Sequence, residues 1–133
     1  IQGSTCMTTQ VYQSISDRVA ELGNAITNAG DKGHFFGGIL RLAAHDFMDF
    51  DRNANDGSTG GSDGCLDFDD SENAGLRDIW CDNGCSFKDL YDQVYSNLGI
   101  SIADYWVAGA NAAVRATSVG NSLDLPFRSV GAV

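Results

Sequence analysis

The sequence predicts an all-α domain that carries one long ordered loop rich in Asp and Gly. Apolar residues recur at helical spacing in four segments, and no segment of any length alternates apolar and polar residues as a half-buried strand does. Residues 49–86, in contrast, are crowded with Asp, Asn, Gly and Ser and contain few aliphatic residues. The chain of 133 residues is long enough for one domain with a core of its own.

Two helices are expected before the loop. The first spans residues 10–29, and Gly30 is typical of a residue that ends a helix. Four apolar residues of this segment fall on one stripe: Ile15, Val19, Leu22 and Ile26. The second runs from Phe35 to Phe47 and is more apolar, which predicts deeper burial.

Two further helices are expected after the loop. Ser86 and Asp89 form a capping pattern for a helix that ends at Gly99 and carries the apolar residues Phe87, Leu90, Val94 and Leu98. Ser101 and Asp104 repeat this pattern before a last helix that runs to about residue 117. Its apolar residues lie on most sides, so we expect it at the centre of the domain.

The net charge of the chain indicates which classes of partner it can bind. Its net charge is −10 and its isoelectric point about 4.2. Nucleic acids and anionic membranes require a basic patch, so neither is expected as a partner. No apolar run approaches the roughly 20 residues of a membrane helix. The composition fits a secreted, extracellular protein or one that binds cations.

Four cysteines, Cys6, Cys65, Cys81 and Cys85, predict two disulfides and an oxidising compartment. The spacing of Cys81 and Cys85 also suits zinc, but no second metal-spaced pair accompanies it. Three pairings are possible. A bond from Cys65 to Cys81 or Cys85 is favoured, because these residues lie in adjacent loops, with Cys6 bonded to the other.

The acidic loop contains two patterns that suggest a cation. DRNANDG at residues 51–57 resembles an EF-hand loop, but it lacks the required glycine and the bidentate glutamate. Asp46 and Asp63, with the carbonyl of Gly61, offer a better calcium cage, since calcium prefers carboxylate and carbonyl oxygens. A solvated acidic loop explains the same composition equally well.

LRLAAHDF, residues 40–47, places two polar groups in an apolar helix. Arg41 and His45 are four residues apart and therefore share one face. A structural pair is the commoner reason for such a placement, and a catalytic pair is the other.

Five short motifs together resemble the plant-type (non-animal) haem peroxidase superfamily in order and rough spacing. They are Arg41-Leu-Ala-Ala-His45-Asp46, Gly61-Ser-Asp63-Gly64, Asn73 in SENAGL, Ser101-Ile-Ala103-Asp104 and Leu125-Pro126-Phe127-Arg128. They match the N-terminal, distal half of that superfamily. The resemblance implies that residues 1–133 form one incomplete domain made of the distal-half helices, without the second half and its iron-ligating proximal histidine.

The resemblance implies haem b as cofactor, bound next to Arg41 and His45, and the oxidation of a small organic donor by hydrogen peroxide. His45 would carry the peroxide proton between the two oxygens. Arg41 would stabilise the charge on the departing oxygen. Asn73 would fix the tautomer of His45 by accepting from its other ring nitrogen.

The same resemblance implies a calcium ion held by Asp46, Gly61 and Asp63. The chain also departs from the family: the usual aromatic residue before the distal histidine is Ala44, and the usual calcium-binding hydroxyl is replaced by Cys65. Two other functions stay open. One is a haem-free, non-catalytic extracellular module that assembles with itself or packs on a partner chain, such as the missing C-terminal half. The other is a calcium-stabilised binding module.

Overall fold

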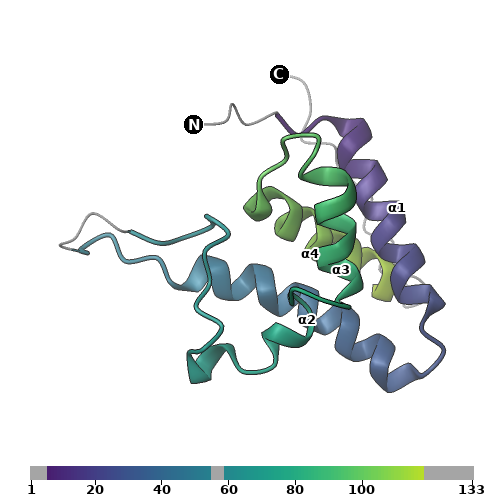
Figure 1. Ribbon diagram of the computed structural model, residues 1–133, viewed down its shortest axis with the longest axis horizontal. Helices are drawn as coiled ribbons and strands as arrows, with labels where there is room; N and C mark the ends of the chain where they lie inside the picture. The colour runs from purple at the N-terminus through teal and green to yellow at the C-terminus, as the bar shows by residue number, and fades with distance from the viewer. Residues whose placement is uncertain (1–5, 55–58, 119–133) are drawn as a thin grey trace.

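Three long helices form the body of the protein. The computed structural model describes residues 6–54 and 59–118, and within them it is helical without a β-strand, as the sequence predicts (Figure 1). The long helices are α1 (Thr9–Ala25), α2 (Ala29–Met48) and α4 (Ile102–Ser118). Helix α4 packs against both α2 and α1, which confirms its predicted central position. None of the helices in the described part of the chain combines the length and the hydropathy that crossing a membrane requires.

The core lies where α4 meets the other two long helices. Tyr105 and Trp106 of α4 have no solvent exposure, and Ile39 and Leu42 of α2 are equally buried. Gly109 lets an aromatic ring approach α4, because a β-carbon there would lie 2.6 Å from Cζ of the Phe87 ring. Close packing of this kind is what makes the helix interface sensitive to small changes of volume.

The boundary between α1 and α2 differs from the prediction. Helix α1 ends at Ala25, and Gly30 lies in the first turn of α2 instead of ending α1. Asn28 explains this difference, because its side-chain oxygen accepts hydrogen bonds from the backbone N–H groups of Gly30 (2.8 Å) and Asp31 (3.0 Å). An N-cap of this kind starts a new helix where composition alone suggested the end of the first.

The helix expected from residue 86 contains a change of helix type. Helix α3 (Ser86–Leu90) continues into η3 (Tyr91–Tyr95), which is a π-helical turn. Of the apolar residues that this helix was expected to carry, Val94 and Leu98 are exposed. A π-helical turn has a wider i→i+5 repeat than an α-helix, so the later side chains point in new directions.

The capping of these last helices was predicted in part. Ser86 is the first helical residue and makes no cap of its own, because Cys85 holds the N-cap position. Gly99 has a left-handed backbone (φ 77°) after η3, as expected for the end of this segment. Ser101 accepts a hydrogen bond from the backbone N–H of Asp104 (3.1 Å) at the start of α4, which confirms that cap.

The loop between α2 and α3 is long, as predicted, and two short 3₁₀ turns, η1 (Ser71–Asn73) and η2 (Leu76–Asp78), interrupt it. It extends beyond the helical body near the C-terminal end of α2 (Figure 1). Leu76 is fully buried, and Ile79 packs directly on Gly38 of α2. The second half of the loop is therefore attached to α2 by apolar contacts.

One disulfide joins Cys81 to Cys85, with 5.5 Å between their α-carbons. The favoured pairing of Cys65 with one of these two is therefore wrong, and the zinc alternative fails because both thiols are consumed. Cys6 and Cys65 are free and exposed. The bond closes a short local loop directly before α3, and sequence separation alone does not distinguish such a local pairing from a longer one.

Candidate functional site

The candidate site lies on the outer face of α2, near its C-terminal end. Arg41 and Ala44 are exposed there, between the exposed apolar side chains of Leu40 and Met48. His45 is half-buried at the edge of the same face. The helical spacing therefore places the two polar groups on one face as predicted, and it surrounds them with apolar surface.

His45 is held by a side chain from the loop. Its Nδ1 lies 2.7 Å from Oδ1 of Asn73. The Asn73 amide is itself oriented, because its Nδ2 donates to the backbone carbonyl of Asp67 (2.7 Å). Since Oδ1 can only accept, the proton of a neutral His45 belongs on Nδ1, and Nε2 is left with a free lone pair.

Arg41 is held by the next residue of the same loop segment. Its Nη1 donates to the carbonyl of Ala74 at 3.3 Å. Gly75 follows in a left-handed conformation (φ 83°) that L side chains rarely adopt. One turn of the loop thus positions both the guanidinium and the imidazole.

An ion pair stabilises the loop close to this contact. Nη2 of Arg77 lies 2.7 Å from Oδ1 of Asp69, and the guanidinium also lies over the Phe68 ring, 5.8 Å from its centroid. Both partners of the ion pair are largely exposed, so its contribution to stability is small. Asp69 and Arg77 lie on either side of Asn73 in this loop segment.

Asp46 lies on the opposite side of α2 and has no solvent exposure. Its carboxylate accepts from the backbone N–H of Gly64 (3.0 and 3.2 Å) and from the side chain of Ser62. Burial raises the pKa of this carboxyl above its ordinary value, and the nearby carboxylates of Asp63 and Asp49 raise it further. The buried negative charge is therefore only partly compensated by protein groups.

The other two predicted calcium ligands lie in the same loop as Gly64. The carbonyl of Gly61 accepts from the N–H of Asp63 (2.7 Å), and the Asp63 carboxylate accepts from the N–H of Cys65 (2.9 Å). In the part of the chain that the structure describes, no three or more Asp, Glu, His or Cys side chains are grouped as metal ligands. The loop folds back on Asp46, but a calcium cage is not formed by these side chains alone.

The sequence prediction missed Asp49, which connects α2 to this loop. Its Oδ1 accepts from the N–H of Gly61 at 2.6 Å, and a β-carbon on Gly60 would lie 2.6 Å from the same oxygen. The sequence contained a clue to this contact. Asp49 follows Asp46 by three residues, and the loop later contains two consecutive glycines, Gly60 and Gly61. Asp49 adds a third carboxylate to those of Asp46 and Asp63.

The described residues include no pair of histidines that could hold a haem iron between them. The sequence contains two histidines, His34 and His45. His34 is exposed and lies 4.0 Å from the Asp78 carboxylate. It lies 11 residues before His45 on α2, about 16 Å along the helix at 1.5 Å per residue, so the two histidines cannot face each other across a macrocycle.

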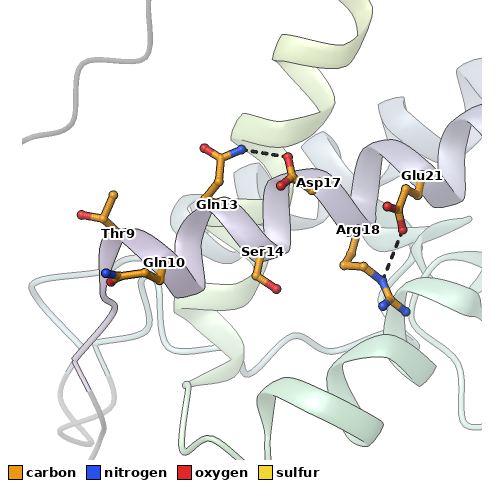
Figure 2. Close-up of a pocket in the computed structure, with 7 residues that line it drawn as sticks. All are labelled: Thr9, Gln10, Gln13, Ser14, Asp17, Arg18 and Glu21. Atoms are coloured by element: carbon orange, nitrogen blue, oxygen red, sulfur yellow. Dashed lines mark hydrogen bonds and ion pairs between the residues drawn. The ribbon is translucent and has the colours of Figure 1, made fainter.

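A shallow pocket lies on α1, away from all of these residues (Figure 2). It is lined by seven polar or charged residues: Thr9, Gln10, Gln13, Ser14, Asp17, Arg18 and Glu21. Within it, Gln13 donates to Asp17 (2.8 Å), and Arg18 pairs with Glu21 (3.5 Å). It contains none of the residues predicted from the sequence.

Comparison with known proteins leaves the family open: no protein-family model matches the sequence, and neither a curated protein nor a solved structure matches the chain. The resemblance to haem peroxidases therefore rests on the five motifs. One of them, Leu125-Pro126-Phe127-Arg128, lies outside the described residues, as does part of the EF-hand-like segment.

Proposed function

We propose that this chain is the distal, peroxide-cleaving half of a haem peroxidase. The observation that supports this function best is the hydrogen bond between Nδ1 of His45 and Oδ1 of Asn73. It leaves Nε2 of His45 as a base, four residues from the guanidinium of Arg41 on the same face of α2.

His45 and Arg41 have separate roles in the proposed reaction. Nε2 of His45 would take a proton from one oxygen of hydrogen peroxide and return it to the other, which would depart as water. Arg41, which stays protonated, donates hydrogen bonds to the charge that develops on the departing oxygen. Haem, when bound, supplies the iron that binds peroxide and takes up its oxidising equivalents.

In this proposal a residue of a second polypeptide segment or chain would bind the haem iron. The apolar side chains beside the site support such a partner, since Leu40, Phe47, Met48 and Phe50 are all about half exposed or more. A set of exposed apolar side chains of this size commonly marks an interaction surface. The same observation supports the alternative of a haem-free extracellular module that assembles with itself or with another chain.

Calcium at Asp46, Gly61 and Asp63 is part of the same proposal. The raised pKa of Asp46 supports it, because an uncompensated buried carboxylate gains most from a cation. Calcium should then raise the midpoint of thermal unfolding of the wild type and leave Asp46→Asn unchanged. Equal shifts in both proteins would show that calcium acts elsewhere.

Haem titration of this chain, produced in a secretory expression host together with the segment or chain that would supply the iron ligand, tests the main proposal. We expect a Soret absorption band and peroxide-dependent oxidation of a small phenol. His45→Ala should lower kcat/KM for peroxide by about 10²–10⁴, the usual contribution of a general acid–base group. His34→Ala is the matched control and should leave the rate unchanged. A haem-free preparation that assembles with itself would overturn the proposal in favour of the alternative.

A further inference from the structure

A connected group of aromatic rings crosses the core from Trp80 to Tyr95. The rings of Trp80 and Trp106 meet edge to face at 5.1 Å, and Trp80 lies 6.2 Å from Tyr105. The Tyr105 ring is in turn 5.4 Å from that of Tyr95. Indole and phenol rings are the side chains most easily oxidised by one electron after the thiols, and neighbouring rings at these distances exchange electrons by tunnelling.

The four rings differ in whether an oxidised state can be stabilised by loss of a proton. Trp106 has no exposure, and its Nε1 has no hydrogen-bond partner to accept a proton. The hydroxyl of Tyr105 donates to the carbonyl of Phe87 (2.8 Å), and a carbonyl is too weak a base to take the proton. Burial raises the pKa of the unoxidised Tyr105 hydroxyl above its ordinary value.

Tyr95 differs from these rings because its hydroxyl reaches an exposed hydroxyl. Its Oη lies 2.9 Å from Oγ of Ser14, although the Tyr95 side chain is only 1% exposed. Ser14 is exposed on α1 and lines the shallow pocket of Figure 2. A proton leaving Tyr95 can therefore pass to Ser14 while Ser14 releases its own proton to water.

The local backbone adds a second, independent observation. Tyr95 lies at the end of the π-helical turn η3, in a segment where the sequence predicted an ordinary α-helix. Such turns are rare and are frequent at functional sites. Here the turn coincides with the placement of Tyr95 against Tyr105 and Ser14.

We propose that these rings form an electron-transfer relay in which Tyr95 is the radical site and Ser14 its proton outlet. A one-electron oxidant removes an electron from Trp80 or Trp106. Tyr95 then supplies that electron through Tyr105 and loses its hydroxyl proton to water through Ser14, which gives a neutral tyrosyl radical and a restored tryptophan. A reductant at the α1 pocket can return one electron and one proton by the same route.

The relay itself depends only on the aromatic core. Only the identity of its natural oxidant rests on the proposed peroxidase function. Pulse radiolysis with azide radicals, which oxidise tryptophan, therefore tests it without haem. The chain has two tryptophans and four tyrosines, so few signals overlap. All samples carry Tyr12→Phe, because Tyr12 on α1 is partly exposed and open to direct oxidation.

In the Tyr12→Phe protein we expect the indolyl radical to decay into a tyrosyl radical at a rate independent of protein concentration. Adding Tyr95→Phe should remove most of the tyrosyl signal, and Ser14→Ala should slow its appearance. Tyr91→Phe is the matched control, since the Tyr91 hydroxyl donates to the carbonyl of Ile100 (2.9 Å) and should not form the radical. Circular dichroism confirms that each variant folds.

Two results would overturn the relay. One is a tyrosyl signal in Tyr95→Phe as large as in the parent protein. The other is an equal loss in Tyr91→Phe. Either result stands whether or not the protein binds haem, so failure of the relay and failure of the proposed peroxidase function are distinguishable.

Discussion

The two faces of α2 are built from similar side chains but have different surroundings. On the inner face, Ile39 and Leu42 have no exposure, because α4 packs against them. On the outer face, Leu40 and Met48 are 46% and 67% exposed. The inner face forms part of the core, whereas the outer face is accessible to a ligand or partner.

The polar residues on the two faces are held differently as well. Asp46 is fully buried and bonded to backbone and hydroxyl groups of the loop. His45, its neighbour in sequence, is half-buried and oriented by Asn73, 28 residues later. One helix thus presents a structural carboxylate and a candidate base in different directions, and the loop contacts both.

The largest expected effect comes from truncating equivalent leucines on the two faces. Leu42→Ala should lower the free energy of unfolding by about 3 kcal/mol, because it leaves a cavity between α2 and α4. Leu40→Ala should change it by less than about 0.5 kcal/mol. Urea unfolding measures both. Equal losses would mean that the outer face is covered in solution.

Alanine substitutions at the adjacent glycines Gly37 and Gly38 of α2 should have smaller effects on stability, and the two effects should have opposite signs. A β-carbon on Gly38 would lie 2.4 Å from Cγ1 of Ile79, so Gly38→Ala should destabilise the protein by about 2 kcal/mol through overpacking. Gly37 has no atom within 4 Å of its β-position, and Gly37→Ala should stabilise it by about 0.5–1 kcal/mol through helix propensity. Thermal unfolding checks both signs, and destabilisation by Gly37→Ala would contradict this account.

The buried carboxylate predicts a pH dependence. The pKa of Asp46 is raised in the folded state above its ordinary value of 3.8, so its contribution to stability is complete below that pH and is lost as the pH rises through the folded pKa. Asp46→Asn does not titrate and should therefore become more stable relative to wild type as the pH increases above 3.8 in calcium-free buffer. Urea unfolding at several pH values measures this trend.

The exposed Asp31 of α2 is the control for this experiment. Asp31→Asn removes a carboxylate from the same helix at a position that is exposed instead of buried. The pH trend of Asp46→Asn relative to wild type should be absent from Asp31→Asn. A common trend in both variants would assign it to the net charge of the protein.

The smallest effect on stability is expected at Asn73. Asn73→Ala removes the acceptor of His45 Nδ1 and should cost about 1 kcal/mol. Its sharper consequence is on His45, whose nitrogen-15 spectrum should change from the Nδ1–H tautomer to a mixture. Asn83→Ala, at an exposed loop position, should leave both unchanged. A His45 spectrum that stays the same in Asn73→Ala would show that Asn73 does not set the tautomer.

Interactions between neighbours in sequence were predictable. The cap of Ser101 on Asp104, the end of a helical segment at Gly99 and the shared face of Arg41 and His45 all follow from the identity of residues within one turn of each other. Such interactions depend on local backbone geometry, which each residue type constrains by itself.

Contacts between distant segments were decided by the tertiary structure. The sequence suggested Asn73 as the partner of His45 only through a family resemblance, and the distance of 2.7 Å depends on how the whole loop folds back on α2. The exposure of Val94 followed from a π-helical turn beside α4, and Cys81 bonded to Cys85 instead of to a distant thiol.

The sequence by itself determined that this protein is helical, acidic and equipped with Arg41 and His45 on one face of a helix. Only the tertiary structure decided that this face stays exposed and that Asp46 is buried behind it. The physical reason is the range of the forces involved. Helical periodicity fixes which side chains share a face, but burial depends on which other segments pack against that face.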